Sequence, residues 1–196
     1  MQFMKMGILA AAVAGVMGMA TQVHANSIDP TSGTYSLVSS GGGLFTYAFD
    51  MSVSSNSEVD TNDYFALTIP NLVSDSGPNA SWTATTPAGV VTVAPSLPLA
   101  QQIAVASPAA LYTYTGAGIS GAPSGTDLGV FKFTTTGATT GLIIGGAQYH
   151  LIVADTLQSN SISLVAAPLP NAAYLGMGTL AGLGAVGALR KRLVRA

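Results

Sequence analysis

The sequence contains no cysteine, and charged residues make up only 7% of its 196 positions. Without cysteine the chain can form neither a disulfide nor a thiolate metal site, so export to an oxidising space must be argued from targeting signals. Basic residues are scarcest in the middle of the chain, where Lys132 is the single base of residues 26–167. Surfaces that bind nucleic acid carry many lysine and arginine side chains, so the sequence excludes nucleic acid as a partner.

The charges that are present are divided between the middle and the ends. All eight acidic residues lie within residues 26–167, which together with Lys132 gives this part a formal charge of −7. The remaining five bases lie in the two apolar ends. Composition therefore divides the chain into residues 1–25, a polar body of residues 26–167, and residues 168–196. The length of the body suits one domain.

Residues 1–25 are typical of a secretory signal peptide. Lys5 precedes an uncharged run, residues 7–20, that is rich in alanine, valine and methionine. Val23 and Ala25 then place modest or small side chains at the −3 and −1 positions that a signal peptidase reads. We expect cleavage after Ala25 and export of the body. The alternative, an uncleaved helix or anchor, is disfavoured because the apolar core is short.

A second apolar run lies near the C-terminus, at residues 172–189. It holds 18 uncharged residues, and as a helix it would be roughly 27 Å long, slightly less than the ~30 Å hydrocarbon core of a bilayer. Basic residues follow it at Arg190, Lys191, Arg192 and Arg195, and a basic cluster stays on the cytoplasmic side. The sequence therefore predicts one transmembrane helix with the body facing outward. A soluble core helix would need a polar face, which this run lacks.

Pro168, Leu169 and Pro170 stand directly before this run, so a Pro-x-Pro motif, a weakly apolar span and an arginine-rich end follow in order. This order resembles the PEP-CTERM sorting signal. Leu169 replaces the glutamate of the commonest form, and the segment is closer to the variant in which Pro-Leu-Pro precedes small residues and an aromatic. Two prolines also favour an extended backbone outside the membrane, which a peptidase can bind.

The resemblance implies that an exosortase, a membrane peptidase, processes the chain during export. It further implies that the inner membrane holds the precursor only transiently. The mature body would then lie at the cell surface or in the extracellular matrix, with exopolysaccharide as a partner there. A proline-stiffened linker before a permanent anchor remains the alternative.

The body shows the two-residue period of β-strands. In residues 44–53 large apolar side chains alternate with small or polar ones, which predicts a half-buried strand. Further strands are predicted at residues 65–69, 81–85, 90–94, 101–105, 112–115, 130–135, 141–144, 147–154 and 161–165. Glycine, proline and asparagine separate them, so we expect an all-β body, an antiparallel two-sheet β-sandwich. Loops are expected at residues 71–79, 95–99 and 116–127, and residues 98–110 leave room for one helical turn.

Residues with catalytic chemistry are few. His150 is the only histidine of the body and lies on the expected strand at residues 147–154. A serine hydrolase would need it beside a serine and an acid, and the G-x-S-x-G pattern of a nucleophile elbow is absent. One histidine also supplies too few ligands for a catalytic zinc site. We therefore expect no catalytic residue and no cofactor.

Four oxygen-bearing residues, Glu58, Asp60, Asn62 and Asp63, crowd into one expected loop. Such spacing can hold calcium, and paired carboxylates can serve a glycosidase. The order of an EF-hand loop is missing, so a solvated acidic turn is the favoured interpretation.

Aromatic residues offer the last candidate site. Trp82, Tyr112 and Tyr114 would suit an aromatic platform for a sugar, although Trp82 is expected to pack in the core of a small all-β domain.

Three functions follow from these observations. The favoured one is an exported, non-catalytic surface or matrix protein. A carbohydrate-binding module of the same shape would need a row of exposed aromatic side chains. An exported hydrolase would need a cleft that joins His150 or the acidic loop to a second catalytic group.

We predict that the exported protein begins at Asn26, because Val23 and Ala25 satisfy the −3 and −1 positions of the cleavage site. Edman sequencing or the mass of the N-terminal peptide measures this end directly. An exported protein that still begins at Met1 would contradict the prediction.

Overall fold

The computed structural model describes residues 25–28, 31–121 and 125–167. These residues belong to one compact unit, Val23–Ala167. The expected leader before Ala25 lies outside the described residues, as does the expected tail at residues 168–196 with its transmembrane helix, so both stay predictions. In the part of the chain that is described, no helix is long and apolar enough to cross a membrane.

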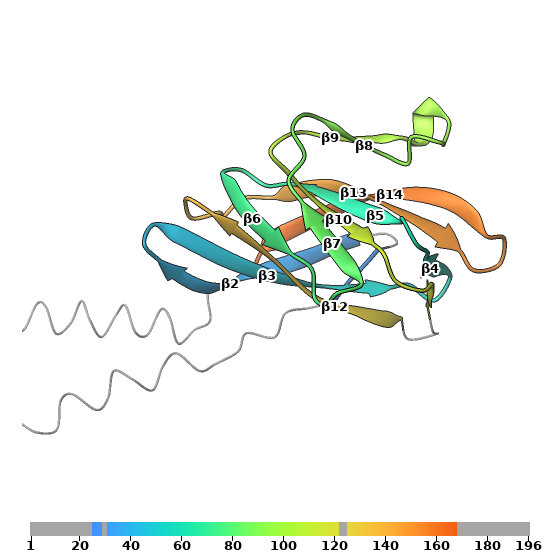
Figure 1. The fold of residues 1–196 in the computed structure, drawn as a ribbon, viewed down its shortest axis with the longest axis horizontal. Helices are drawn as coiled ribbons and strands as arrows, with labels where there is room; N and C mark the ends of the chain where they lie inside the picture. The colour runs from blue at the N-terminus through green and yellow to red at the C-terminus, as the bar shows by residue number, and fades with distance from the viewer. Residues whose placement is uncertain (1–24, 29–30, 122–124, 168–196) are drawn as a thin grey trace, which may run out of the picture. The chain divides into compact units, whose positions relative to one another are not determined.

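Apart from one short turn, the regular secondary structure of the described body consists of strands (Figure 1), which confirms the all-β prediction. A single 3-10 turn, η1 (Leu99–Gln101), lies within residues 98–110, where one helical turn was expected. The strands are β1 (Ala25–Ser27), β2 (Thr31–Gly41), β3 (Leu44–Val53), β4 (Ser57–Val59), β5 (Tyr64–Thr68), β6 (Leu72–Ser76), β7 (Trp82–Thr85), β8 (Val91–Val93), β9 (Ile103–Val105), β10 (Ala109–Tyr114), β11 (Ile119–Ser120), β12 (Thr126–Thr135), β13 (Ile143–Leu151) and β14 (Thr156–Ala166).

Most strands belong to one continuous sheet. Its order is β6-β12-β3-β2-β14-β13-β5-β10-β7, with β1, β4 and β11 attached beside this path. Neighbours are antiparallel except for β14 with β2 and β1 with β3. The sheet curls until its edge strands β6 and β7 contact each other (Figure 1), so it is nearly closed.

This arrangement differs from the predicted two-sheet sandwich, because hydrogen bonds run without a break from one edge of the sheet to the other. Bulges explain how long strands pass around the core. The register shifts between Leu37 and Ser39, where β2 pairs with β3, and between Asp127 and Gly129, where β12 pairs with β3. A bulge increases the local twist and bends the strand, so one sheet can cover the core on several sides.

Aromatic rings fill the centre of the core. Phe49 of β3 and Phe131 of β12 stack at 5.7 Å, and Phe65 of β5 and Tyr112 of β10 stack at 4.7 Å. The two stacks meet edge to face, with the Phe65 and Phe131 rings 5.0 Å apart. These rings come from opposite parts of the strand order, so their contacts hold the curled sheet together. The alternation predicted for residues 44–53 is confirmed, and β3 matches that range from end to end.

Trp82 packs against Phe131 at a ring distance of 5.0 Å and is only 5% exposed, as expected for a core residue. Tyr112 and Tyr114 are also buried. The alternative of an aromatic sugar platform formed by these three residues is therefore wrong, because their rings face the interior of the sheet.

Three predicted segments differ in the structure. Residues 71–79 were expected to be a loop, yet they contain β6, and the loop expected at residues 116–127 contains β11 and the start of β12. The strands predicted at residues 141–144 and 147–154 are one strand, β13. Gly145 and Gly146 are required there by close packing: a Cβ at Gly145 would lie 2.0 Å from the Ala66 carbonyl oxygen.

A separate two-stranded sheet, β8 with β9, forms a second layer over the outer face of β5 and β13 (Figure 1). Val93 and Val105 from this hairpin bury themselves against Ala66 of β5. The Tyr64 hydroxyl donates to the Thr92 carbonyl oxygen at 2.8 Å and also accepts the Ala94 N–H at 3.1 Å. The hairpin is thus fixed to the main sheet by a small core of its own.

We predict that Phe49→Ala lowers the free energy of unfolding by about 3–5 kcal/mol, because it removes a fully buried ring and leaves a cavity. A loss of that size is a large part of the ~5–15 kcal/mol that stabilises a typical domain. Urea unfolding followed by tryptophan fluorescence measures the change. Phe45→Ala on the same strand is the control and should cost clearly less, because Phe45 is only partly buried. Equal losses would contradict the closing role of the ring cluster.

Candidate functional site

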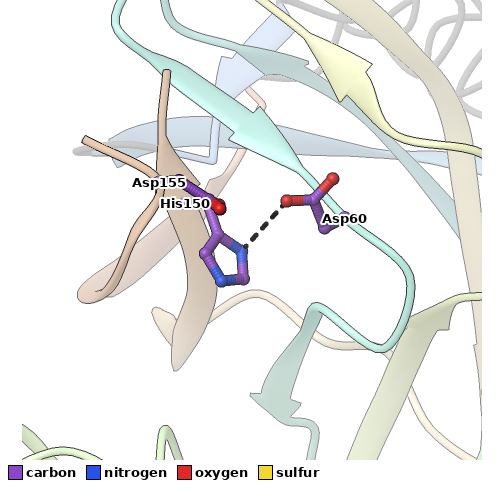
Figure 2. A group of neighbouring side chains, drawn as sticks. All are labelled: Asp60, His150 and Asp155. Atoms are coloured by element: carbon purple, nitrogen blue, oxygen red, sulfur yellow. Dashed lines mark ion pairs between the residues drawn. The ribbon is translucent and has the colours of Figure 1, made fainter. Parts of the chain in front are cut away.

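The fold brings His150 to the acidic loop that precedes β5. His150 lies near the end of β13, which pairs with both β5 and β4. Its Nδ1 atom is 2.8 Å from Oδ2 of Asp63 and 3.6 Å from Oδ2 of Asp60. Figure 2 shows the Nδ1 side of the ring facing the Asp60 carboxylate, with Asp155 close to the histidine. Residues 87 positions apart in the chain thus form one cluster.

Asp63 is the buried centre of this cluster, with a side chain that is 1% exposed. Its carboxylate accepts hydrogen bonds from the Asp60 N–H at 3.0 Å and from Nε2 of Gln148 at 3.2 Å, in addition to its contact with His150. A buried carboxylate is tolerated only when it is paired and hydrogen-bonded. These contacts meet that requirement, and the contact with His150 also fixes the orientation of its imidazole.

Backbone contacts hold the loop in place under His150. The Asp63 N–H donates to the Asp60 carbonyl oxygen at 2.9 Å, which closes a turn. Asn62 has a φ of 77°, in the left-handed region that asparagine enters more readily than most residues. The N–H of Asn62 donates to the Tyr114 carbonyl oxygen, and the Tyr114 N–H donates to that of Asp63, both at 2.8 Å. The loop is therefore anchored to β10 as well as to β13.

The environment changes the pKa of both members of the pair. Burial raises the pKa of the Asp63 carboxyl, while its hydrogen bonds from Asp60, His150 and Gln148 act in the opposite direction. Burial by itself would lower the pKa of His150. The hydrogen bond to Asp63 and the charges of Asp63, Asp60 and Asp155 outweigh it and raise the pKa of His150 above its ordinary value. The cluster therefore favours a protonated imidazole beside a carboxylate.

Of the four acidic-loop residues singled out from the sequence, Asp60 and Asp63 join His150. Glu58 lies opposite His150 in the β4–β13 register, and its Oε2 accepts a hydrogen bond from the Ser120 hydroxyl at 3.1 Å. The side chain of Asn62 is exposed, and its backbone contributes to the loop. The favoured interpretation, a solvated acidic turn, is wrong for Asp63, because its side chain is buried. Calcium binding by the four residues, the less favoured alternative, stays a hypothesis.

A different set of residues offers ligand atoms for a metal. Atoms of Asp60, His150 and Asp155 lie within 4.8 Å of one another. An imidazole with two carboxylates suits a transition metal such as Zn²⁺ or Mn²⁺ better than Ca²⁺, which prefers oxygen ligands. Asp155 occupies the β13–β14 turn with a φ of 47°. Asp155 and Gln148 were not predicted as site residues, because neither belongs to a recognisable sequence motif.

A second perturbed carboxyl lies on β3, away from the acidic loop. Burial and then the charge of Asp127 raise the pKa of Asp50 to about 6, and the two side chains are hydrogen-bonded. A carboxyl with a pKa of about 6 also changes charge in weakly acidic solution, so its effect on stability must be separated from that of His150.

Comparison with known proteins adds little to this geometry. No model of a known protein family matches the chain, and no curated protein matches it. Among solved structures, the chain is similar to the N-terminal domain of PorA. The two are 8% identical, the match covers 69% of this chain and 86% of that chain, and the TM-score is 0.25.

We predict that His150→Gln lowers the free energy of unfolding near pH 6 and has little effect near pH 9, as measured by urea unfolding. Because the folded pKa of His150 is raised, its stabilising effect is complete below the unfolded pKa of about 6.5 and disappears as the pH rises through the folded pKa. We expect a loss of about 1 kcal/mol, below the ~1.5–3 kcal/mol of a hydrogen bond to a charged group, because His150 is partly exposed.

Asp155→Asn is the matched control for this prediction. Asp155 acts on His150 only through its charge, so its replacement should change the pH dependence less than His150→Gln does. The titration of Asp50 is common to all three proteins and cancels in the differences. An equal loss at both pH values for His150→Gln would show that the imidazole stabilises the fold by packing alone.

Proposed function

We propose that the protein is an exported, non-catalytic component of the cell surface or extracellular matrix, sorted through its C-terminal tail. The observation that carries the proposal is that the last strand, β14, ends at Ala166, just before the proline motif. Ala166 pairs with Tyr35 in the β14–β2 ladder, and the Ala167 N–H donates to the Tyr35 carbonyl oxygen at 2.8 Å. The next residue is Pro168, the first residue of the Pro-Leu-Pro motif. A peptidase that recognises this motif can remove the tail without removing a strand.

The beginning of the body supports removal of the leader in the same way. Cleavage after Ala25 leaves Asn26 and Ser27, which pair with Met51 and Ser52 of β3. Ile28 is fully buried, and its N–H donates to the Ser52 carbonyl oxygen at 2.6 Å. The expected mature chain would lose the pairing of Ala25 with Asp50 but keep the other two pairs of β1 and the buried Ile28.

The composition of the tail favours a transient role in the membrane. Its 18-residue apolar run includes five glycines, which lower both helix propensity and hydrophobicity relative to a leucine-rich anchor. Such a span holds the precursor at the inner membrane while an exosortase-type peptidase acts on the extended prolines. The same arrangement gives the two prolines a use that a permanent anchor would not have.

We predict that replacing both Pro168 and Pro170 with alanine reduces release of the protein in a host that contains an exosortase. The prolines keep the backbone extended at the membrane surface, so their loss should leave most of the protein in the membrane fraction with its tail intact. Fractionation followed by intact mass measures the result. The matched control replaces Pro95 and Pro98, which lie in an exposed turn of the body, and should be released like the wild type.

Release of the Pro168 and Pro170 double variant with the wild-type efficiency and the wild-type C-terminal mass would overturn the sorting proposal. Neutral replacements of Arg190, Lys191 and Arg192 test the orientation separately. They remove most of the positive charge that keeps the tail on the cytoplasmic side, so the body should reach the outer side less often.

A further inference from the structure

A groove runs between the β8–β9 hairpin and the main sheet. One hollow of about 290 Å³ lies between the segment from Ala100 to Ile103 and the β14 segment from Gln158 to Ser161. A second hollow of about 330 Å³ lies between β9 and the outer face of β13 and β14. Ile103 and Ser161 line both hollows, so the two are adjacent, and together they are called here the β9–β14 groove.

The groove has a defined construction, because the hairpin is held at several points. Ile103 packs directly over Gly146 of β13, where even a Cβ atom would lie 2.8 Å from the isoleucine side chain. The Ser159 hydroxyl donates to the Gln101 carbonyl oxygen, which ties η1 to β14. Nε2 of Gln102 donates to the Leu97 carbonyl oxygen at 2.7 Å and braces the turn from within. The walls are therefore positioned before any ligand arrives.

The lining of the groove consists of uncharged polar and aliphatic side chains. No residue that lines either hollow is ionisable. The side-chain amides of Gln101 and Gln158 make no hydrogen bond within the described ranges, so both can donate to and accept from a ligand. Ile144 is 54% exposed and supplies an aliphatic patch in the second hollow.

We propose that the β9–β14 groove binds a segment of a neutral polysaccharide. Amides and hydroxyls match sugar hydroxyl groups, which both donate and accept, while Ile103 and Ile144 can contact the C–H face of a sugar ring. Each hollow is near the ~300 Å³ lower limit of small-molecule pockets, and the two meet, so the ligand extends beyond one sugar unit. The body carries eight acids against Lys132 alone, which repels acidic polymers and selects an uncharged chain.

This groove belongs to the folded body, so its ligand is independent of how the tail is sorted. Sorting is measured by fractionation of cells, whereas groove binding is measured with purified protein. A failure of either experiment leaves the other proposal intact.

The test is native affinity electrophoresis of the full chain, purified in a detergent without a sugar headgroup that would compete for the groove. Gels contain dextran, laminarin or hydroxyethyl cellulose as neutral polymers, or alginate as an acidic one. We expect retardation by at least one neutral polymer and none by alginate. Gln158→Ala should weaken the retardation several-fold, because it removes the hydrogen bonds that one amide makes to the polymer.

Ser161→Trp should abolish retardation by filling the point where the two hollows meet. Ser40→Trp, on an exposed position of β2, is the matched control and should bind like the wild type. Circular dichroism and thermal melting verify that each variant is folded. If Ser161→Trp does not fold, Gln158→Ala still tests the proposal. Absence of retardation in all three neutral gels, retardation in alginate alone, or binding unchanged in both folded groove variants would overturn the proposal.

Discussion

The contact between the two aromatic stacks is the interaction on which the rest of the structure depends. Phe49 and Phe131 come from one part of the strand order, and Phe65 and Tyr112 come from the other. A curled sheet without disulfides closes only if its inner face buries enough apolar surface, and large rings supply most of that surface in a small body. Closure then places β13 beside both β4 and β5. The histidine cluster and the groove both depend on that placement.

The Asp63 and His150 pair shows how a body with few charges uses them. Burial of an isolated carboxylate would be costly, and His150, Gln148 and the Asp60 N–H together offset that cost. The pair joins the loop before β5 to the end of β13, so it is a structural tie as well as a titrating group. Metal binding by Asp60, His150 and Asp155 would require the imidazole to lose its proton.

Local patterns in the sequence predicted the strands that alternate strictly and missed those that do not. β3 was predicted in full because each second residue is large and apolar. β2 was not predicted, since its serines and glycines conceal the period of two. Gly145 and Gly146 were interpreted as a break, although they lie within β13 and make room for Ala66 and Ile103. In each miss, a tertiary contact overrode a local propensity.

The candidate site was predictable only in pieces. Composition alone identified the acidic loop and His150 as candidates. The sequence around each of them does not indicate that they are in contact, because that contact depends on the β13–β5 register. The burial of Trp82 was expected from its size, whereas the sequence left open which face of the sheet Tyr112 and Tyr114 occupy. Periodicity within one strand says nothing about its neighbours.

Closure also determines which surfaces remain for interaction. The two edge strands of the sheet, β6 and β7, contact each other, so neither presents a fully open edge that would promote aggregation. The β8–β9 hairpin covers part of the outer face and leaves the groove along β14. At the end of β14, the Ala167 N–H still donates to the Tyr35 carbonyl oxygen. Removal of both predicted end segments would leave the groove, the hairpin and the ring cluster unchanged, because all three lie between residues 31 and 167.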